Sequence, residues 1–180
     1  MSGIINQTGA KSGIVGTTVG TPAGGLSEAD VWRNTSDMYL FREPISTWER
    51  ADTYGAGTQL GTGMSESSGV FTFPSTGHWL VNYYLYVYFD GNTRYFELKM
   101  QYSSNSGSGW DVTSTAANFL GDSGQNSGNI SGSCAGSQIL NITNASTSRV
   151  RFDHTGENSS VNMKGSSTMN ATYATFIKLG

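Results

Sequence analysis

One stretch of this chain, GHWLVNYYLYVYFDG at residues 77–91, restricts the fold more than any other part of the sequence. Side chains of a β-strand point alternately to its two faces, so alternate residues form two separate sets. One set suits a protein core: Trp79, Val81, Tyr83, Leu85, Val87 and Phe89. The other set is too apolar for water and too polar for a dry interior: Leu80, Asn82, Tyr84, Tyr86 and Tyr88. The pattern predicts a long strand with one buried face and a second face that something must cover.

The rest of the chain favours short strands over helices. Glycine accounts for 24 of 180 residues and charged residues for only 13%, while aromatic residues reach 12%. Such a composition is poor in helix formers and too aromatic for a disordered chain. Segment 95–102 alternates clearly, Asp90–Gly91 is a strong hairpin signal, and segment 121–138 reads as a long loop or weak edge strand. We therefore expect an all-β, antiparallel β-sandwich of jelly-roll type.

The first 26 residues form a separate compositional zone that is rich in glycine and nearly free of charge. Two apolar pairs stand out in it: Ile4 with Ile5, and Ile14 with Val15. Two pairs are too few to build a core, so we expect residues 1–26 to form an extended arm whose apolar pairs anchor the protein to another protein. The alternative is a flexible tail. Residues 27–180 then form the jelly-roll domain.

Charge and cysteine content narrow the range of partners. The formal net charge of −3 gives no electrostatic footprint for nucleic acid or an anionic membrane. A single cysteine, Cys134, excludes an intrachain disulfide. The sequence begins without a basic segment followed by an apolar one, and its longest apolar run is about half of the ~20 residues that a membrane helix needs. We expect a protein made as a soluble intracellular product, with no nucleic-acid or membrane partner.

Catalytic and metal-binding motifs are weak. The string GDSG at 121–124 matches the nucleophile segment of chymotrypsin-like proteases, but the two histidines, His78 and His154, lie in no histidine motif. Asp90, Asn92, Asp111 and Asp122 match no calcium loop, and two histidines with one cysteine make no zinc site. We predict no catalytic residue, no metal and no cofactor, and therefore no enzyme. A glycosidase pair among the thirteen acidic residues stays open as an alternative.

Two segments carry a resemblance: SSGVFTFPSTGHWLVNYYLYV at 67–87 and ATYATFIKLG at 171–180. They resemble the C1q/TNF-like jelly roll, in which a Gly-x-Phe-x-x-Pro-x-x-Gly-x-aromatic stretch leads into a long central strand and an aromatic strand ends the chain. The segments SGIINQTGAKSGIVGTT and WERADTYGAGTQLGTGMSESSG are similar to stretches common in structural proteins of marine bacteriophages. No collagen-like stalk precedes the domain, which favours the phage branch over the complement-type members.

The resemblance also offers a cover for the tyrosines. Modules of this family assemble as tight trimers whose inner sheet faces the threefold axis, so the resemblance implies a homotrimer. Tyrosine suits such an interface because its ring offers a large contact area and its hydroxyl group can form hydrogen bonds. The implied interface residues are Tyr84, Tyr86, Tyr88, Tyr173, Thr175, Ile177 and Leu179. The alternative is that a long loop of the same chain covers the tyrosines.

These features predict a non-enzymatic structural protein of a bacteriophage virion. We expect a homotrimeric capsid decoration or cement protein, assembled in the host cytoplasm and attached by its arm to other virion proteins, foremost the major capsid protein, on the particle exterior. The alternative is a tail or head fibre that recognises host surface glycans, with Trp110 as the candidate contact. A depolymerase acting on host polysaccharide is a third class.

Overall fold

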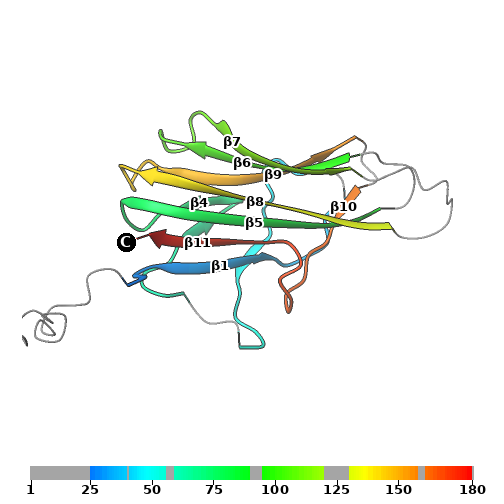
Figure 1. Ribbon diagram of the computed structural model, residues 1–180, viewed down its shortest axis with the longest axis horizontal. Helices are drawn as coiled ribbons and strands as arrows, with labels where there is room; N and C mark the ends of the chain where they lie inside the picture. Colours follow the sequence, from blue (N-terminus) through cyan, green and yellow to red (C-terminus); the bar gives the residue numbers. More distant parts are fainter. Residues whose placement is uncertain are drawn as a thin grey trace, which may run out of the picture.

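The computed structural model describes residues 25–39, 41–55, 59–89, 95–119, 130–157 and 161–179. The predicted arm lies outside these residues except for Gly25 and Leu26, and so do its four apolar side chains. Within the described residues the secondary structure is entirely β, in two antiparallel sheets, and no helix is long and apolar enough to cross a membrane (Figure 1). The predicted all-β sandwich is confirmed.

The first sheet, here called sheet A, is organised around the long strand β5. Strand β8 pairs with one edge of β5 along its whole length, while β11 and β10 share the other edge and β1 and β2 continue beyond β11. Its strands are β1 (Ala29–Asn34), β2 (Trp48–Arg50), β5 (Gly77–Phe89), β8 (Ile130–Ile142), β10 (Val161–Met163) and β11 (Tyr173–Leu179). Of the two alternatives for 121–138, a long loop or a weak edge strand, the structure shows a strand from Ile130 onward, which belongs to β8.

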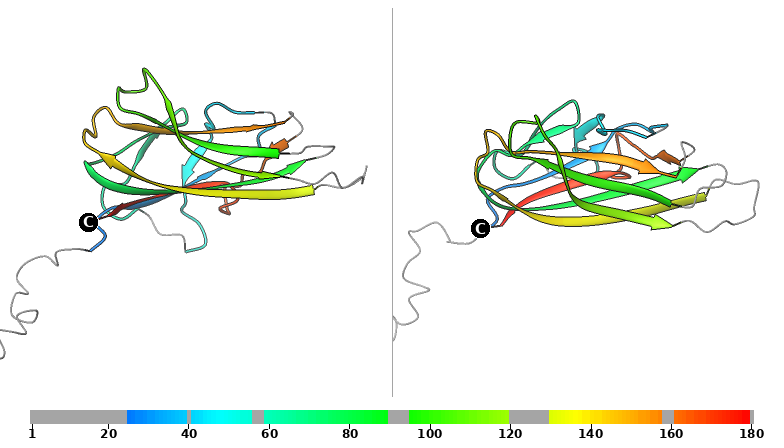
Figure 2. Two further views of the ribbon diagram at one scale, coloured as in Figure 1. Left: turned by 45° about the horizontal axis from the view of Figure 1, so that its top comes forward. Right: turned by 90° about the horizontal axis from the view of Figure 1, so that it is seen from above.

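The second sheet, sheet B, packs face to face on sheet A (Figure 2). Its strands follow the order β3-β4-β9-β6-β7, and a bulge lies between Met100 and Gln101 on the side of β6 that pairs with β7. Their bounds are β3 (Ser65–Ser67), β4 (Val70–Thr72), β6 (Tyr95–Ser103), β7 (Asp111–Phe119) and β9 (Arg149–Gly156). Strand β7 begins directly after Trp110.

The core between the sheets is built from aromatic rings. Phe71 lies at its centre, with ring centroids 5.5 Å from Trp32, 5.4 Å from Trp48, 5.9 Å from Phe152 and 5.0 Å from Phe176. The inward set of β5 is buried as predicted, at most 2% exposed at each of Trp79, Val81, Tyr83, Leu85 and Val87. The side chain of Phe89 lies outside the described part. Because one set of β5 residues fills the core, the alternate set is forced onto the outer face of sheet A.

Gly136 shows how closely β8 approaches this core. It pairs with Tyr83, and a Cβ atom at Gly136 would overlap the phenol ring. The Tyr83 hydroxyl donates a 2.6 Å hydrogen bond to Ser114 Oγ on β7, so this one side chain links the edges of the two sheets. Only glycine leaves room for the ring at this position.

Candidate assembly interface

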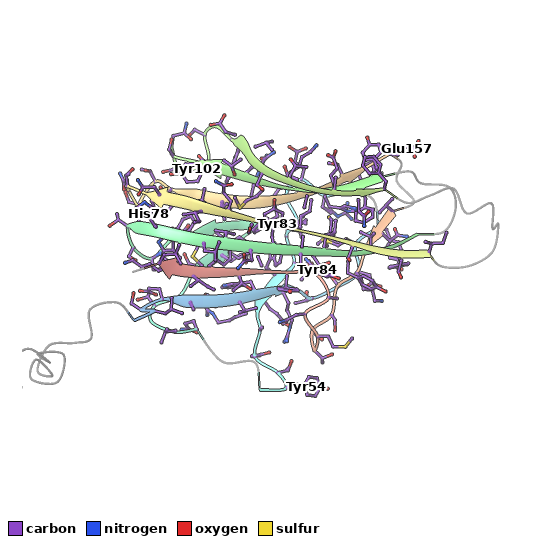
Figure 3. The ribbon with its side chains drawn as sticks, in the orientation of Figure 1. Tyr54, His78, Tyr83, Tyr84, Tyr102 and Glu157 are labelled. Carbon is purple, nitrogen blue, oxygen red and sulfur yellow. The ribbon has the colours of Figure 1, made fainter. Side chains whose placement is uncertain are left out.

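The outer face of sheet A brings the predicted interface residues together. We call this surface the tyrosine face, made of Leu80, Asn82, Tyr84, Tyr86 and Tyr88 on β5 and Tyr173, Thr175, Ile177 and Leu179 on β11. The strand register places Tyr84 opposite Tyr173, Asn82 opposite Thr175, and Leu80 opposite Ile177. Figure 3 shows Tyr84 in the middle of the sheet, where β5 and β11 run side by side. The sequence therefore predicted correctly which residues share this face.

The tyrosine face changes in character along the strands. Near the end where β11 finishes, an aliphatic row crosses the sheet: Ile139, Leu80, Ile177, Ala29 and Leu60. Further along β5, the Tyr84 and Tyr173 rings stack with centroids 5.4 Å apart and planes inclined by 28°. Ile139 is 53% exposed and Leu60 47% exposed, which is unusual for side chains of this size in a continuous row.

No described loop of the chain buries the tyrosines. Tyr84, Tyr86 and Tyr88 are all half-buried, with Asp37 and Lys164 beyond the strands against Tyr88, whereas Tyr83 on the inner side is 2% exposed. The covering loop considered from the sequence is therefore not found in the described part of the chain.

A trough runs beside the tyrosines because β8 presents small side chains to them. Its outward residues opposite Tyr88, Tyr86, Tyr84 and Asn82 are Ser131, Ser133, Ala135 and Ser137. Two shallow, open hollows of about 330 and 370 Å³ lie in this trough. The first is lined chiefly by Tyr84, Tyr173 and Ser137, and the second by Tyr86, Tyr88, Ser131 and Lys164. Such hollows could accept side chains from a contacting protein.

Asp37 organises the far end of the tyrosine face, where β5 ends. It accepts hydrogen bonds from Lys164 Nζ at 2.8 Å, from the Gly165 amide at 3.0 Å and from the Tyr88 hydroxyl at 3.4 Å. The hydrogen bond from Asp37 raises the pKa of Lys164, and Lys164 Nζ lies 5.4 Å from the centre of the Tyr88 ring. A hydrogen bond with Tyr39, together with burial and Asp37, raises the pKa of Tyr88 above its usual range. This end therefore carries a charged Lys–Asp pair and a neutral phenol at neutral pH.

Arg33 forms one wall of the face, and no pattern in the sequence indicated this role. It pairs with Tyr173 in the register, yet its side chain is only 1% exposed. Its guanidinium donates to Glu49 at 2.8 Å, to Asp52 at 2.6 Å and to Thr53 Oγ1 at 2.8 Å. These bonds fix the base of the loop that carries Tyr54, which is 87% exposed and labelled in Figure 3.

Trp110, the candidate glycan contact, belongs to sheet B and not to the tyrosine face. The Arg151 guanidinium lies 4.5 Å from the centre of its ring, and Arg151 also donates a 2.6 Å hydrogen bond to Gln101. One side of the ring is thus occupied by the protein itself.

The residues considered for catalysis are not brought together. His78 is exposed at the start of β5, whereas His154 on β9 is fully buried, and GDSG lies outside the described residues. Burial raises the pKa of Cys134 to about 11, which keeps it as a thiol. Among the described residues, no three His, Cys, Asp or Glu side chains form a group that could hold a metal ion.

Solved structures share this architecture. Eiger TNF from S. frugiperda aligns with a TM-score of 0.64 and 13% identity, covering 87% of this chain and 94% of its own. Murine APRIL at pH 5.0 aligns with a TM-score of 0.59 and 12% identity, covering 84% of this chain and 98% of its own. No protein-family model and no curated protein matches the sequence. The chain therefore has the fold of the TNF-like jelly rolls.

Proposed function

We propose that this protein is a non-enzymatic structural protein that works as a homotrimer, with three copies closing around the tyrosine face. The observation that carries the proposal is the exposed, continuous surface formed by the aliphatic row and the stacked Tyr84 and Tyr173 rings. A soluble protein rarely leaves so large an apolar strip in water without a partner. The tendency of TNF-like folds to form trimers supports three copies as the arrangement.

A threefold assembly needs a second, different surface on each copy, because cyclic trimers have heterologous interfaces. The sandwich edge formed by β7 and β8 offers one. On β7, Val112 and Phe119 are 54% and 78% exposed, while Ile139 of β8 belongs to the aliphatic row of the tyrosine face itself. This edge adjoins the tyrosine face through the pairing of β8 with β5, so each copy carries both halves of such an interface.

We further propose that the trimer decorates or cements a bacteriophage capsid, on the outside of the particle. The support is the sequence resemblance of the N-terminal and middle segments to marine phage structural proteins. In this scheme the arm, through Ile4, Ile5, Ile14 and Val15, attaches to other virion proteins, the major capsid protein first among them. Trimerisation would present three arms at one site, so that weak individual contacts gain from a high effective concentration.

The assembly is tested by solution mass from light scattering. We expect the wild type at three times 19.2 kDa, Tyr84→Arg as a folded monomer, and the control Ser65→Arg, exposed on β3 at the edge of sheet B opposite β7, as a trimer. The arginine at 84 would place a charge inside the closed interface without a partner. A wild-type monomer, or a trimer that survives Tyr84→Arg, would contradict the proposal.

Attachment is tested separately by deleting residues 1–25. We expect the truncated chain to remain trimeric but to stop sedimenting with capsids of the cognate phage. If the truncated trimer still decorates capsids, the arm is not the anchor. That result would leave the proposed trimer unaffected.

The second candidate is a fibre module that binds host glycans. The observation in its favour is that Trp110 keeps part of its ring exposed beside Arg151 and Gln101, a combination of aromatic and polar groups suited to sugars. A glycan screen with wild type and Trp110→Ala distinguishes this role from decoration.

A further inference from the structure

The connection between β1 and β2 joins the two sheets. We call residues 37–39 and 41–45 the strap. Met38 exchanges two backbone hydrogen bonds with Met163 of β10 in sheet A, at 2.9 and 3.0 Å. Arg42 exchanges two with His154 of β9 in sheet B, at 3.2 and 2.9 Å, and the Ile45 amide donates to Phe152 at 2.8 Å. The strap thus enters both sheets through only a few backbone bonds.

His154 lies at the point where the strap meets sheet B. Its side chain is fully buried, and neither ring nitrogen has a hydrogen-bond partner. The Phe41 ring of the strap packs edge-on against the imidazole, with centroids 5.8 Å apart and planes at 85°. A neutral imidazole is tolerated here at some cost, but an imidazolium would be a buried charge with two unpartnered donors. Burial accordingly lowers the pKa of His154 to about 4.

No charged group of the neighbouring strands is placed to neutralise an imidazolium. On β9 the adjacent Asp153, and on β6 Glu97 and Lys99, point to the opposite side of sheet B, because Leu98 is the residue opposite His154. On the strap, Glu43 approaches Arg151 on that opposite side, and the Arg42 guanidinium bonds to the carbonyl of Phe41. Arg42 is positively charged and would oppose a second positive charge nearby.

We propose that the strap is an acid-released latch, in which protonation of His154 frees residues 41–45 from β9 while the two sheets stay folded. Moving the strap aside lets water reach the imidazolium, which relieves the buried charge at the loss of three backbone hydrogen bonds. Strand β9 keeps its pairing with β6 along its length and with β4, so the opening is local.

The latch has a consequence for the tyrosine face. Asp37 begins the strap and holds Lys164 and Tyr88, so release of the strap loosens the charged end of that face. The latch itself does not depend on the proposed trimer, since all its contacts lie within one chain.

Amide hydrogen exchange of the full chain between pH 7 and pH 4 tests the latch. With an unfolded pKa near 6.5 and a folded pKa near 4, the opening constant should rise about 20-fold from pH 7 to pH 5, after correction for intrinsic exchange rates. We expect the Arg42, Ile45 and His154 amides, which donate the three bonds lost on opening, to lose protection by this factor, while the paired amides of β6 lose little.

His154→Phe removes the titrating group and keeps a flat ring, so its strap amides should show no such pH dependence. Asp153→Asn serves as the control and should keep the wild-type response of the strap. Equal loss of protection in the strap and β6, or the same pH profile in His154→Phe, would overturn the proposal. If His154→Phe does not fold, the comparison of strap and β6 amides within the wild type still decides the matter.

Discussion

The two outer faces of the sandwich are built on opposite principles. The tyrosine face of sheet A carries rings, aliphatic side chains and hydroxyls, and its charges lie at its margins, where Arg33 binds Glu49 and Asp52 and Lys164 binds Asp37. The middle of the outer face of sheet B is a ladder of compensating charges, with Glu97 3.0 Å from Lys99 and Arg151 3.7 Å from Asp153, and its exposed apolar side chains, Val112 and Phe119, lie on the edge strand β7. The middle strands of sheet B thus satisfy their polar groups within the chain or from water, whereas those of sheet A leave apolar area uncovered. The difference indicates which face awaits a partner.

The contrast between the two faces predicts the largest change in the free energy of unfolding at the edge of the tyrosine face. The double change Glu49→Gln with Asp52→Asn should lower the free energy of unfolding by about 3 kcal/mol, because it leaves the buried Arg33 guanidinium without a counter-charge. The matched change Glu97→Gln, on the solvated ladder, should cost less than about 1 kcal/mol. Denaturant unfolding of both variants measures this. Equal losses in the free energy of unfolding would mean that the ion pairs of the two faces do not differ in their contribution to stability.

A smaller effect concerns Asp153, the most buried charge on the sheet B face, at 1% exposed. Burial raises its pKa to about 6, above the ordinary 3.8, so the folded state holds its proton more tightly than the unfolded state. The stability that this proton confers is complete below pH 3.8 and is lost as pH rises through 6. Asp153→Asn should therefore raise the free energy of unfolding by about 2 kcal/mol at pH 7 and leave it unchanged at pH 3.5.

The variant and the wild type should be compared by unfolding curves at the same pH. His154 also makes the free energy of unfolding depend on pH, with the opposite sign, but it does so equally in the two proteins. The folded pKa of His154 is lowered, so its contribution to stability is lost as pH falls from 6.5 through 4. A gain from Asp153→Asn that is the same at pH 3.5 and pH 7 would show that ionisation of Asp153 is not its source.

The smallest effect is expected at Trp110. Trp110→Ala should reduce stability by about 1 kcal/mol through loss of its stacking with Arg151, without changing the assembly state. Thermal unfolding and light scattering measure the two quantities. Binding of a host glycan by wild type but not by Trp110→Ala would favour the fibre function and would make the sheet B face a working surface as well.

The sequence predicted the two faces of β5 because alternation is a local property. Ala174 and Phe176 of β11 are likewise fully buried, as the alternation in 171–180 implies. The sequence left residues 130–138 of β8 open between a long loop and a weak edge strand, because their outward residues are serines and alanine, which look like loop composition. Their small size makes sense only beside the tyrosines, and that pairing joins segments about fifty residues apart in the chain.

The Arg33 network and the strap were beyond sequence reasoning for a related reason. The carboxylates that bind Arg33 lie 16 and 19 residues further along, in a segment with no regular pattern. Alternation in RVRFDH places His154 with the buried Val150 and Phe152, but nothing local indicates the strap that packs against it. Both features arise from contacts across the fold and not from periodicity.

Strand β5 supplies core and outer face from one alternating segment, and this couples correct folding to correct association. A slip of one position against β8 or β11 would turn Trp79 and Leu85 outward and drive the tyrosine hydroxyls into the interior, ruining both at once. A subunit with the wrong register would thus lack the tyrosine face, and it could not associate with correctly folded copies.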